Sequence, residues 1–225
     1  MPFGLPDGML RRCCLFLLSF LLWIPALYCS QPLVSEAMLT RLKNDYSPEA
    51  QRRGQAVNHL IEKLESKPVV EKLKEVNRFF NQFQYRSDID HWGQKDYWAT
   101  PEEFIGTQQG DCEDFVIAKY FTLRKLGVPD DRLYLTYVKH LKLNVAHMVL
   151  SYFETPSSNP LILDNYNPAI VTGSQRTDLL PVYSFNAKSL FLTNASAGLG
   201  KSLPTDKIKN SKWQKLLADV REEEK

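Results

Sequence analysis

The sequence is poor in cysteine. It holds four cysteines among 225 residues, and three of them, Cys13, Cys14 and Cys29, lie within the first thirty residues. The rest of the chain keeps only Cys112, so it has no partner for an internal disulfide. A lone thiol in an oxidising compartment is exposed to oxidation, and its presence there points to catalysis or to deep burial as a small hydrophobic residue.

The chain also lacks a strong charge of either sign. Its formal net charge is +2, and Lys and Arg are scattered rather than gathered in a stripe. Nucleic acid is therefore not an expected partner. There is no repeat of about 20 to 50 residues and no glycine-rich phosphate loop. These absences exclude a solenoid and a P-loop nucleotide-binding protein.

The first thirty residues have the pattern of a secretory signal peptide. Arg11 and Arg12 precede residues 13–24, which are apolar except for one serine, and Pro25 ends the run. The run is too short for a membrane-spanning helix, which needs roughly 20 apolar residues. We therefore predict a signal peptide over residues 1–30.

The cleavage point of this leader is less well defined. Tyr28 is bulky where signal peptidase prefers a small residue, and it also stands where a small residue should precede a lipidated Cys29. An uncleaved anchor and a lipoprotein remain the alternatives. Residues 31–225 are long enough for one domain with its own core.

The first half of this domain has helical signals. Apolar residues recur at helical spacing over residues 56–64 and again over 68–83. Residues 100–103, with the sequence TPEE, supply an N-cap, a proline at the first helical position and a Glu three residues after the cap. Asp111 opens a further helix, for which Gly127 is the stop signal.

After Pro129 the pattern changes to extended segments rich in Val, Leu, Tyr and Phe. These segments predict antiparallel strands at residues 132–138, 146–153, 160–166, 182–186 and 189–193. Residues 213–220 predict a closing helix, and residues 222–225 a solvated tail. Helices followed by strands define an α+β domain.

Cys112 lies in the first turn of a predicted helix. A cysteine attacks as its thiolate, and the unpaired N–H groups and dipole of a helix N-terminus favour that charge. The same N–H groups can bind a developing oxyanion. Cys112 is therefore a candidate nucleophile, which needs a histidine as its general base.

Among the four histidines, His147 is best placed to act as this base. It begins a predicted strand, whereas His59 lies on a helix, His91 in a Trp-rich loop and His140 in a polar turn. The next strand ends in Asp164, and on adjacent antiparallel strands the two side chains can share a hydrogen bond. Taken singly, a strand-end His and an Asp in a turn are ordinary structural residues.

Three acidic residues surround the candidate nucleophile. Asp111, Glu113 and Asp114 should raise the pKa of the thiol unless a cation offsets them. Calcium prefers such oxygen ligands. Equally, Asp111 can be an N-cap, Asp114 its capping-box partner, and Glu113 a residue that favours the first turn. Composition and spacing alone leave these two interpretations open.

Several motifs nevertheless match one family. The segments are GDCEDF at residues 110–115, AKY at 118–120, HMVL at 147–150 and LILDN at 161–165. In order and spacing they closely resemble the bacterial transglutaminase-like cysteine proteinases, and the likeness covers residues 69–192. It implies a transglutaminase-like, papain-like fold with the nucleophile at a helix N-terminus packed on an antiparallel sheet.

The resemblance also implies specific site residues. It implies a triad of Cys112 as nucleophile, His147 as general base and Asp164 as the residue that orients the histidine. It further implies calcium dependence, with Asp111 and Glu113 the surest ligands and Asp114 a third. Additional oxygens would come from the loop before Thr100, among Asp88, Asp90 and backbone carbonyls.

The function implied by the resemblance is that of a periplasmic endopeptidase. It would cut a large repeat-type surface adhesin near the adhesin's N-terminus, at a di-alanine site, and release cells from a biofilm. An inner-membrane cyclic-di-GMP receptor would sequester it. Two alternatives use the same fold: a transglutaminase that forms an amide from glutamine, and a non-catalytic binding module. We expect a monomer without an organic cofactor.

Overall fold

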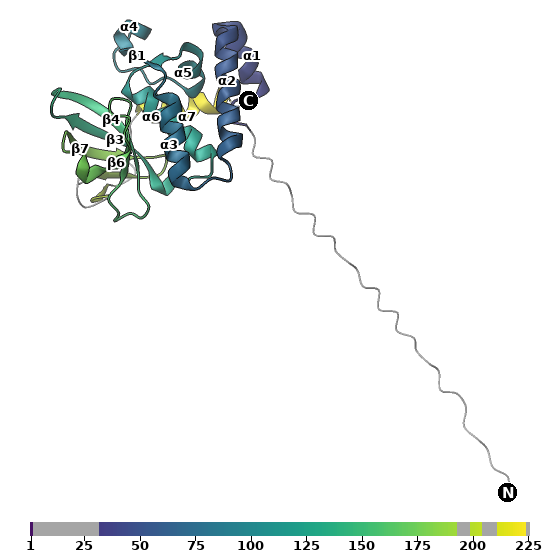
Figure 1. The fold of residues 1–225 in the computed structure, drawn as a ribbon. Helices are drawn as coiled ribbons and strands as arrows, with labels where there is room; N and C mark the ends of the chain where they lie inside the picture. The colour runs from purple at the N-terminus through teal and green to yellow at the C-terminus, as the bar shows by residue number, and fades with distance from the viewer. Residues whose placement is uncertain (2–31, 193–198, 204–210, 224–225) are drawn as a thin grey trace.

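The computed structural model describes Met1 and residues 32–192, 199–203 and 211–223. Apart from Met1, the signal peptide predicted over residues 1–30 therefore lies outside the described residues. The described part folds as a group of helices beside a seven-stranded sheet (Figure 1). This arrangement confirms the α+β class. None of the helices in these ranges is long and apolar enough to span a bilayer.

Two of the N-terminal helices, α1 and α2, begin at serine caps. The elements are α1 (Glu36–Arg41), the π-helical turn η1 (Leu42–Tyr46), α2 (Pro48–Leu64) and α3 (Val69–Phe80). Ser47 accepts a hydrogen bond from the backbone of Ala50, and Pro48 occupies the first position of α2. The sequence placed the start of this helix at residue 56. That prediction was wrong. Residues 49–53 are mostly polar, so the apolar pattern does not reach the true start of the helix, which the Ser47 cap marks.

The middle of the chain forms short elements around one long helix. They are β1 (Gln84–Tyr85), α4 (Asp88–Trp92), α5 (Pro101–Thr107), β2 (Gln109–Gly110) and α6 (Cys112–Lys125). The capping box predicted at Thr100 is present at the start of α5. The parallel pair β1–β2 and the helix α4 were not predicted, since elements of two to five residues are too short to show a period.

The large sheet has the strand order β6-β5-β4-β3-β7-β8-β9 and is antiparallel throughout. Its strands are β3 (Leu133–His140), β4 (Val145–Tyr152), β5 (Leu161–Leu163), β6 (Val171–Thr172), β7 (Leu179–Phe185), β8 (Leu190–Leu192) and β9 (Ser202–Leu203). Two 3-10 turns, η2 (Asp130–Arg132) and η3 (Gly173–Gln175), precede β3 and β7. All five predicted strands are present, whereas the two-residue edge strands β6 and β9 were not predicted.

Helix α6 is the centre of the fold. It packs against β4 and β3 on one side and against α3 and α5 on the other. Both faces are therefore buried, including Phe115, Ile117 and Tyr120. The rings of Phe80 and Phe104 pack with Phe115 in the core between the helices. This burial fixes α6, and with it Cys112 at its start, relative to the sheet.

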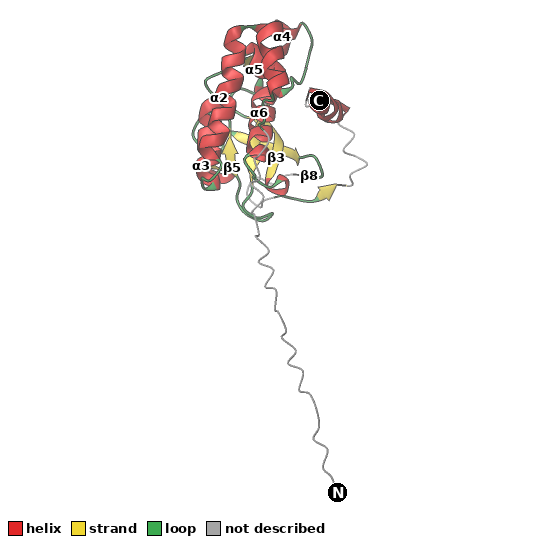
Figure 2. Ribbon diagram, turned by 90° about the vertical axis from the view of Figure 1, so that its right-hand side faces the viewer, coloured by secondary structure: helices red, strands yellow, loops and turns green. Residues whose placement is uncertain are grey.

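Helix α7 (Ser211–Glu223) ends near the point marked C in Figure 2, and the carbonyl oxygen of its last residue accepts a hydrogen bond from Arg41 Nη2 of α1 at 2.7 Å. The Trp213 ring is fully buried and contacts the rings of Trp98, Tyr120 and Phe185. The closing helix is confirmed. The predicted tail is shorter than expected, because Glu222 and Glu223 belong to α7, while residues 224–225 lie outside the described residues.

We predict that Trp213→Ala lowers the free energy of unfolding by about 3–5 kcal/mol, because it leaves a large cavity among aromatic rings. Chemical denaturation measures the change. The control is Lys215→Ala on the same helix, where the exposed ammonium pairs with Asp219 and the expected change is within about 0.5 kcal/mol. Equal effects of the two substitutions would show that α7 does not complete the core.

Candidate active site

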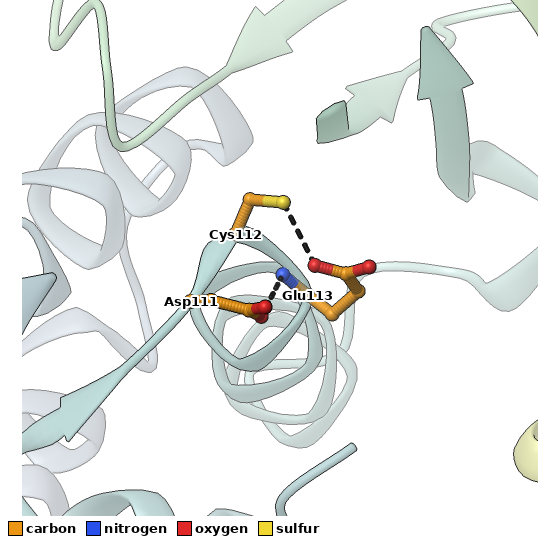
Figure 3. Close-up of side chains that lie close together, drawn as sticks. All are labelled: Asp111, Cys112 and Glu113. Carbon is orange, nitrogen blue, oxygen red and sulfur yellow. Dashed lines mark hydrogen bonds between the residues drawn. The ribbon is translucent and has the colours of Figure 1, made fainter. Parts of the chain in front are cut away.

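Cys112 is the first residue of α6, and Asp111 is its N-cap (Figure 3). Asp111 Oδ1 accepts a hydrogen bond from the Glu113 backbone N–H at 3.2 Å, and Asp114 Oδ2 accepts one from the Asp111 backbone N–H at 3.2 Å. This capping box confirms the start of the helix predicted from the sequence. It holds the thiol in the first turn, where the helix dipole favours a negative charge.

The thiol faces a pocket of about 460 Å³ whose wall includes Cys112, His140, His147, Tyr85 and Tyr166. Burial raises the pKa of the Cys112 thiol, and the backbone N–H of Met148, next to His147 on β4, lowers it in part. Both candidate reactive side chains are nearly buried, with 9 % of Cys112 and 8 % of His147 exposed. The packing of α6 on β4 therefore brings Cys112 and His147 to one pocket.

His147 pairs with Asp164, as the strand order predicted. Strand β5 lies beside β4, with Leu163 opposite Leu150, and Asp164 follows directly after β5. His147 Nε2 lies 2.8 Å from Asp164 Oδ1. This contact occupies one ring nitrogen and leaves Nδ1 as the nitrogen available to a thiol.

The Asp164 carboxylate is almost fully buried and has further donors. The Tyr166 backbone N–H donates to Oδ1 at 2.9 Å, and Arg176 Nη2 donates to Oδ2 at 2.8 Å. Burial opposes its ionisation, but the hydrogen bonds from His147, Tyr166 and Arg176 outweigh burial and lower the pKa of Asp164 to about 2. Asp164 is therefore an anion at neutral pH.

The electrostatics at Cys112 are less favourable. Burial raises the pKa of the thiol well above its usual value, and the carboxylates of Glu113 and Asp111 raise it further. The thiol donates a hydrogen bond to Glu113 Oε2 at 2.7 Å, so Glu113 lies beside the sulfur (Figure 3). The chain's own charges thus oppose the thiolate that the helix N-terminus favours.

Asp111 also belongs to a second group of neighbouring acidic residues. The carboxylates of Asp88, Asp111 and Asp114 each offer an oxygen, and these oxygens lie within 4.8 Å of one another. Burial raises the pKa of Asp88 to about 6 and raises that of Asp111 and Asp114 as well. Asp88 Oδ1 is buried and has no hydrogen-bond partner among the described residues.

This donor set fits a hard divalent cation. Three carboxylates supply oxygen ligands, and a buried oxygen without a partner is costly unless a cation or water satisfies it. Of the residues that the sequence left open, Asp88 lies in the group. Asp90 does not, because it is exposed and accepts a hydrogen bond from Ser87 Oγ. Glu113 instead groups with Asp111 and the thiol.

The remaining histidines occupy different environments. His59 is exposed on α2 near Glu62, and His91 belongs to α4. His140 was predicted in a polar turn, but it is the last residue of β3 and is buried. Its ring centre lies 6.1 Å from that of His147.

The sequence analysis did not predict the residues that hydrogen-bond to Asp164 or to its partners, namely Asn81, Lys119 and Arg176. Asn81 Nδ2 donates to the Asp164 carbonyl oxygen at 2.8 Å, and Lys119 Nζ donates to Asn81 Oδ1 at 2.6 Å. Lys119 is fully buried, and burial lowers its pKa to about 7. Arg176 completes this set on the carboxylate side. Lys119 lies in the AKY motif, but nothing in the sequence connects it, Asn81 or Arg176 to Asp164, because tertiary packing and not chain proximity brings them there.

Cys112 at the start of α6, beside the pair formed by His147 on β4 and Asp164 after β5, is the arrangement of the class of thiol enzymes with a transglutaminase-like fold. The model of one family in this class, the bacterial transglutaminase-like cysteine proteinases (BTLCP), matches residues 43–180. The chain belongs to this family.

Solved structures with a high likeness are those of LapG from Legionella pneumophila. The EGTA-treated LapG structure is 44% identical, with a TM-score of 0.72, over 84% of this chain and 99% of that chain. The calcium-bound structure is 44% identical, with a TM-score of 0.70, over 81% and 97%. A third LapG structure is also 44% identical, with a TM-score of 0.70, over 84% and 99%. No curated protein matches the chain.

We predict that Gly110→Ala destabilises the start of α6. A Cβ at this position would clash with Asp114 Oδ2 and lie 2.8 Å from Asp114 Cβ and 2.9 Å from Phe104 Cδ2. The expected loss is roughly 1–3 kcal/mol in the free energy of unfolding, measured by denaturant titration. In the control, Gly173→Ala, the nearest contact is 3.2 Å to Pro160 Cγ. A Gly110 variant as stable as this control would disprove the close approach.

Proposed function

We propose that the protein is a calcium-dependent periplasmic cysteine endopeptidase that cleaves the N-terminal region of a large repeat-type surface adhesin and so promotes biofilm dispersal. The observation that supports this most directly is the pocket where Cys112 meets the His147–Asp164 pair. Membership of the proteinase family and the likeness to LapG support peptide hydrolysis. The adhesin and the compartment follow from the resemblance of the motifs to adhesin-releasing members and from the leader.

In this proposal the three side chains act as a triad. Cys112 is the nucleophile, and His147 Nδ1 accepts its proton. Asp164 receives the Nε2–H of His147, which fixes the tautomer and stabilises the imidazolium. The backbone N–H of Met148 assists by lowering the pKa of the thiol in part, since a nearby donor favours the charged sulfur.

The reaction proceeds through an acyl-enzyme. The Cys112 thiolate attacks the scissile carbonyl carbon, and the C=O electron pair moves to oxygen, where N–H groups of the first turn of α6 can stabilise it. The C–N bond breaks as the His147 imidazolium protonates the leaving amine. Water then attacks the thioester while His147 takes its proton, the C–S bond breaks, and the acid product leaves.

The proposed calcium ligands are Asp88, Asp111 and Asp114, with Glu113 beside the thiol as a further candidate. The structures of LapG solved with calcium and after EGTA treatment support the choice of metal. Bound calcium would supply positive charge that offsets the carboxylates next to Cys112. The chain's own part is to hold these oxygens together through the α6 cap and the α4 segment.

The partners in this proposal are the adhesin as substrate and an inner-membrane cyclic-di-GMP receptor that sequesters the enzyme. The enzyme acts as a monomer. The triad needs no organic cofactor, because thiol, imidazole and carboxylate supply the nucleophile and the proton transfers. Acyl transfer to an amine uses the same acyl-enzyme and is distinguished by its products.

Cys112→Ala and His147→Ala should each lower cleavage of an adhesin fragment by at least about 10³-fold, and Asp164→Asn by up to roughly 10⁴-fold through the wrong tautomer. Gel electrophoresis of the products measures this. The control, Asp131→Asn, changes an exposed carboxylate on η2 and should keep full activity.

Two shorter products indicate hydrolysis, and a cross-linked ladder indicates acyl transfer. Wild-type cleavage by folded Cys112→Ala would refute the assignment.

A calcium chelator should abolish cleavage, and calcium, but not magnesium, should restore it. Isothermal titration should detect calcium binding directly, with affinity lowered at least tenfold in Asp88→Asn because a buried charged ligand is lost. Asp90→Asn, two residues away on the same helix, should bind calcium like the wild type. Undiminished activity in chelator would rule out the site, and equal rescue by magnesium would identify a different metal.

A further inference from the structure

Arg176 and Asp178 lie directly behind the His147–Asp164 pair, outside the pocket. We propose that they are positioning residues, with Arg176 clamping the Asp164 carboxylate and Asp178 fixing the Arg176 guanidinium. This inference rests on the proposed function, because it assigns them a role in orienting the catalytic imidazole. It concerns residues that follow η3 and precede β7, a segment that contributes no nucleophile, base or metal ligand.

The guanidinium bridges two carboxylates at once. Its Nη2 donates to Asp164 Oδ2 at 2.8 Å and to Asp178 Oδ2 at 2.8 Å, while Nε donates to Asp178 Oδ1 at 2.9 Å. The side chain of Arg176 is 2 % exposed and that of Asp164 is fully buried. A planar fork can make this set of contacts, whereas the ammonium of a lysine is a point charge and cannot span both carboxylates in the same way.

The contact with Arg176 restricts rotation of the Asp164 carboxylate, which would otherwise misalign His147. The last torsion of an Asp side chain is broad, so a carboxylate with one partner can rotate. In this site Tyr166 N–H and His147 hold Oδ1, and Arg176 holds Oδ2. Both oxygens are therefore fixed. The plane of the carboxylate sets the direction of the His147 Nε2–H bond, and through the ring it sets where Nδ1 points.

Asp178 has two tasks in this arrangement. A buried guanidinium is costly unless it is paired, and the bidentate contact with Asp178 pairs Nε and Nη2, while Nη1 has no hydrogen-bond partner among the described residues. Asp178 also ties the clamp to the β3–β4 hairpin. Its carbonyl oxygen accepts a hydrogen bond from Leu141 N–H at 2.7 Å, and its Oδ2 lies 3.5 Å from His140 Nε2.

His140 lies between Asp178 and Tyr166. The Leu143 N–H donates to His140 Nδ1 at 3.3 Å, while Nε2 lies near Asp178 without a hydrogen bond to any described residue. The His140 ring packs edge-on against Tyr166, with ring centres 4.9 Å apart. Tyr166 in turn supplies the backbone donor to Asp164. The carboxylate is thus held by the clamp on one side and by this contact chain on the other.

A merely structural ion pair would hold the strands together without affecting the imidazole. The test therefore measures catalysis and the imidazole separately, on full-length variants Arg176→Met and Arg176→Lys. Arg124→Met is the matched control. It removes an Arg–Asp pair of similar length, 2.7 Å to Asp130, near the opposite end of α6 from Cys112.

Folded Arg176→Met should lose on the order of 10- to 100-fold in kcat, because a small misplacement of a catalytic group carries such a cost. KM should stay within about twofold, since the buried guanidinium does not reach substrate. Arg176→Lys should recover part of kcat by keeping the charge near Asp164. Arg124→Met should keep the wild-type kcat. In proton–nitrogen NMR spectra, the low-field Nε2–H resonance of His147 should shift or broaden in Arg176→Met but not in Arg124→Met.

The NMR signal separates this inference from the proposed function, because it reports the His147–Asp164 hydrogen bond whatever the enzyme cleaves. A folded Arg176→Met with wild-type kcat and an unchanged resonance, while Asp164→Asn is inactive, would overturn the clamp alone. Activity in Asp164→Asn would overturn the proposed function.

If Arg176→Met does not fold, Asp178→Asn provides the test. It should lower kcat several-fold and shift the same resonance, and an unchanged resonance there would also overturn the clamp.

Discussion

The structure depends on one buried anion. Asp164 is an ionised carboxylate with almost no access to water, and a buried charge is tolerated only when it is paired and hydrogen-bonded. Donors from several elements meet this requirement: His147 on β4, the Tyr166 backbone after β5, and Arg176 before β7. Helix α3 supports the backbone of Asp164 through Asn81. The demand for donors at this point thus fixes the relation between the helices and the sheet.

The N-terminus of α6 presents the opposite problem. Its free N–H groups and dipole favour a thiolate at Cys112, while the nearby carboxylates of Asp111 and Glu113 disfavour one. The carboxylates of Asp111 and Asp114 serve as helix caps, so the capping and the metal-binding interpretations do not exclude each other. Asp111 and Asp114 cap the helix with some of their oxygens, and together with Asp88 they leave a compact group of oxygens that suits a cation.

Much of the fold was predictable because long elements carry periodic signals. The capping boxes at Thr100 and Asp111 and the five strands are local features, decided by residues within a few positions of one another. The start of α2 was misplaced, and β6 and β9 were missed, because short or polar elements have too few residues to show a period. His140 was placed in a turn because the polar residues after it obscured the end of β3.

The sequence by itself determined the reactive residue types and their order along the chain: Cys112 behind a capping Asp, His147 in a strand, and Asp164 at the end of the next. Neighbouring strands bring the last two together, so that pairing could be inferred from local order. Only the tertiary structure decided that Asp88 joins the acidic group while Asp90 does not, and that Arg176 reaches Asp164. The physical reason is that these contacts depend on how helices and loops pack, and packing is set by the whole core rather than by the spacing of any two residues.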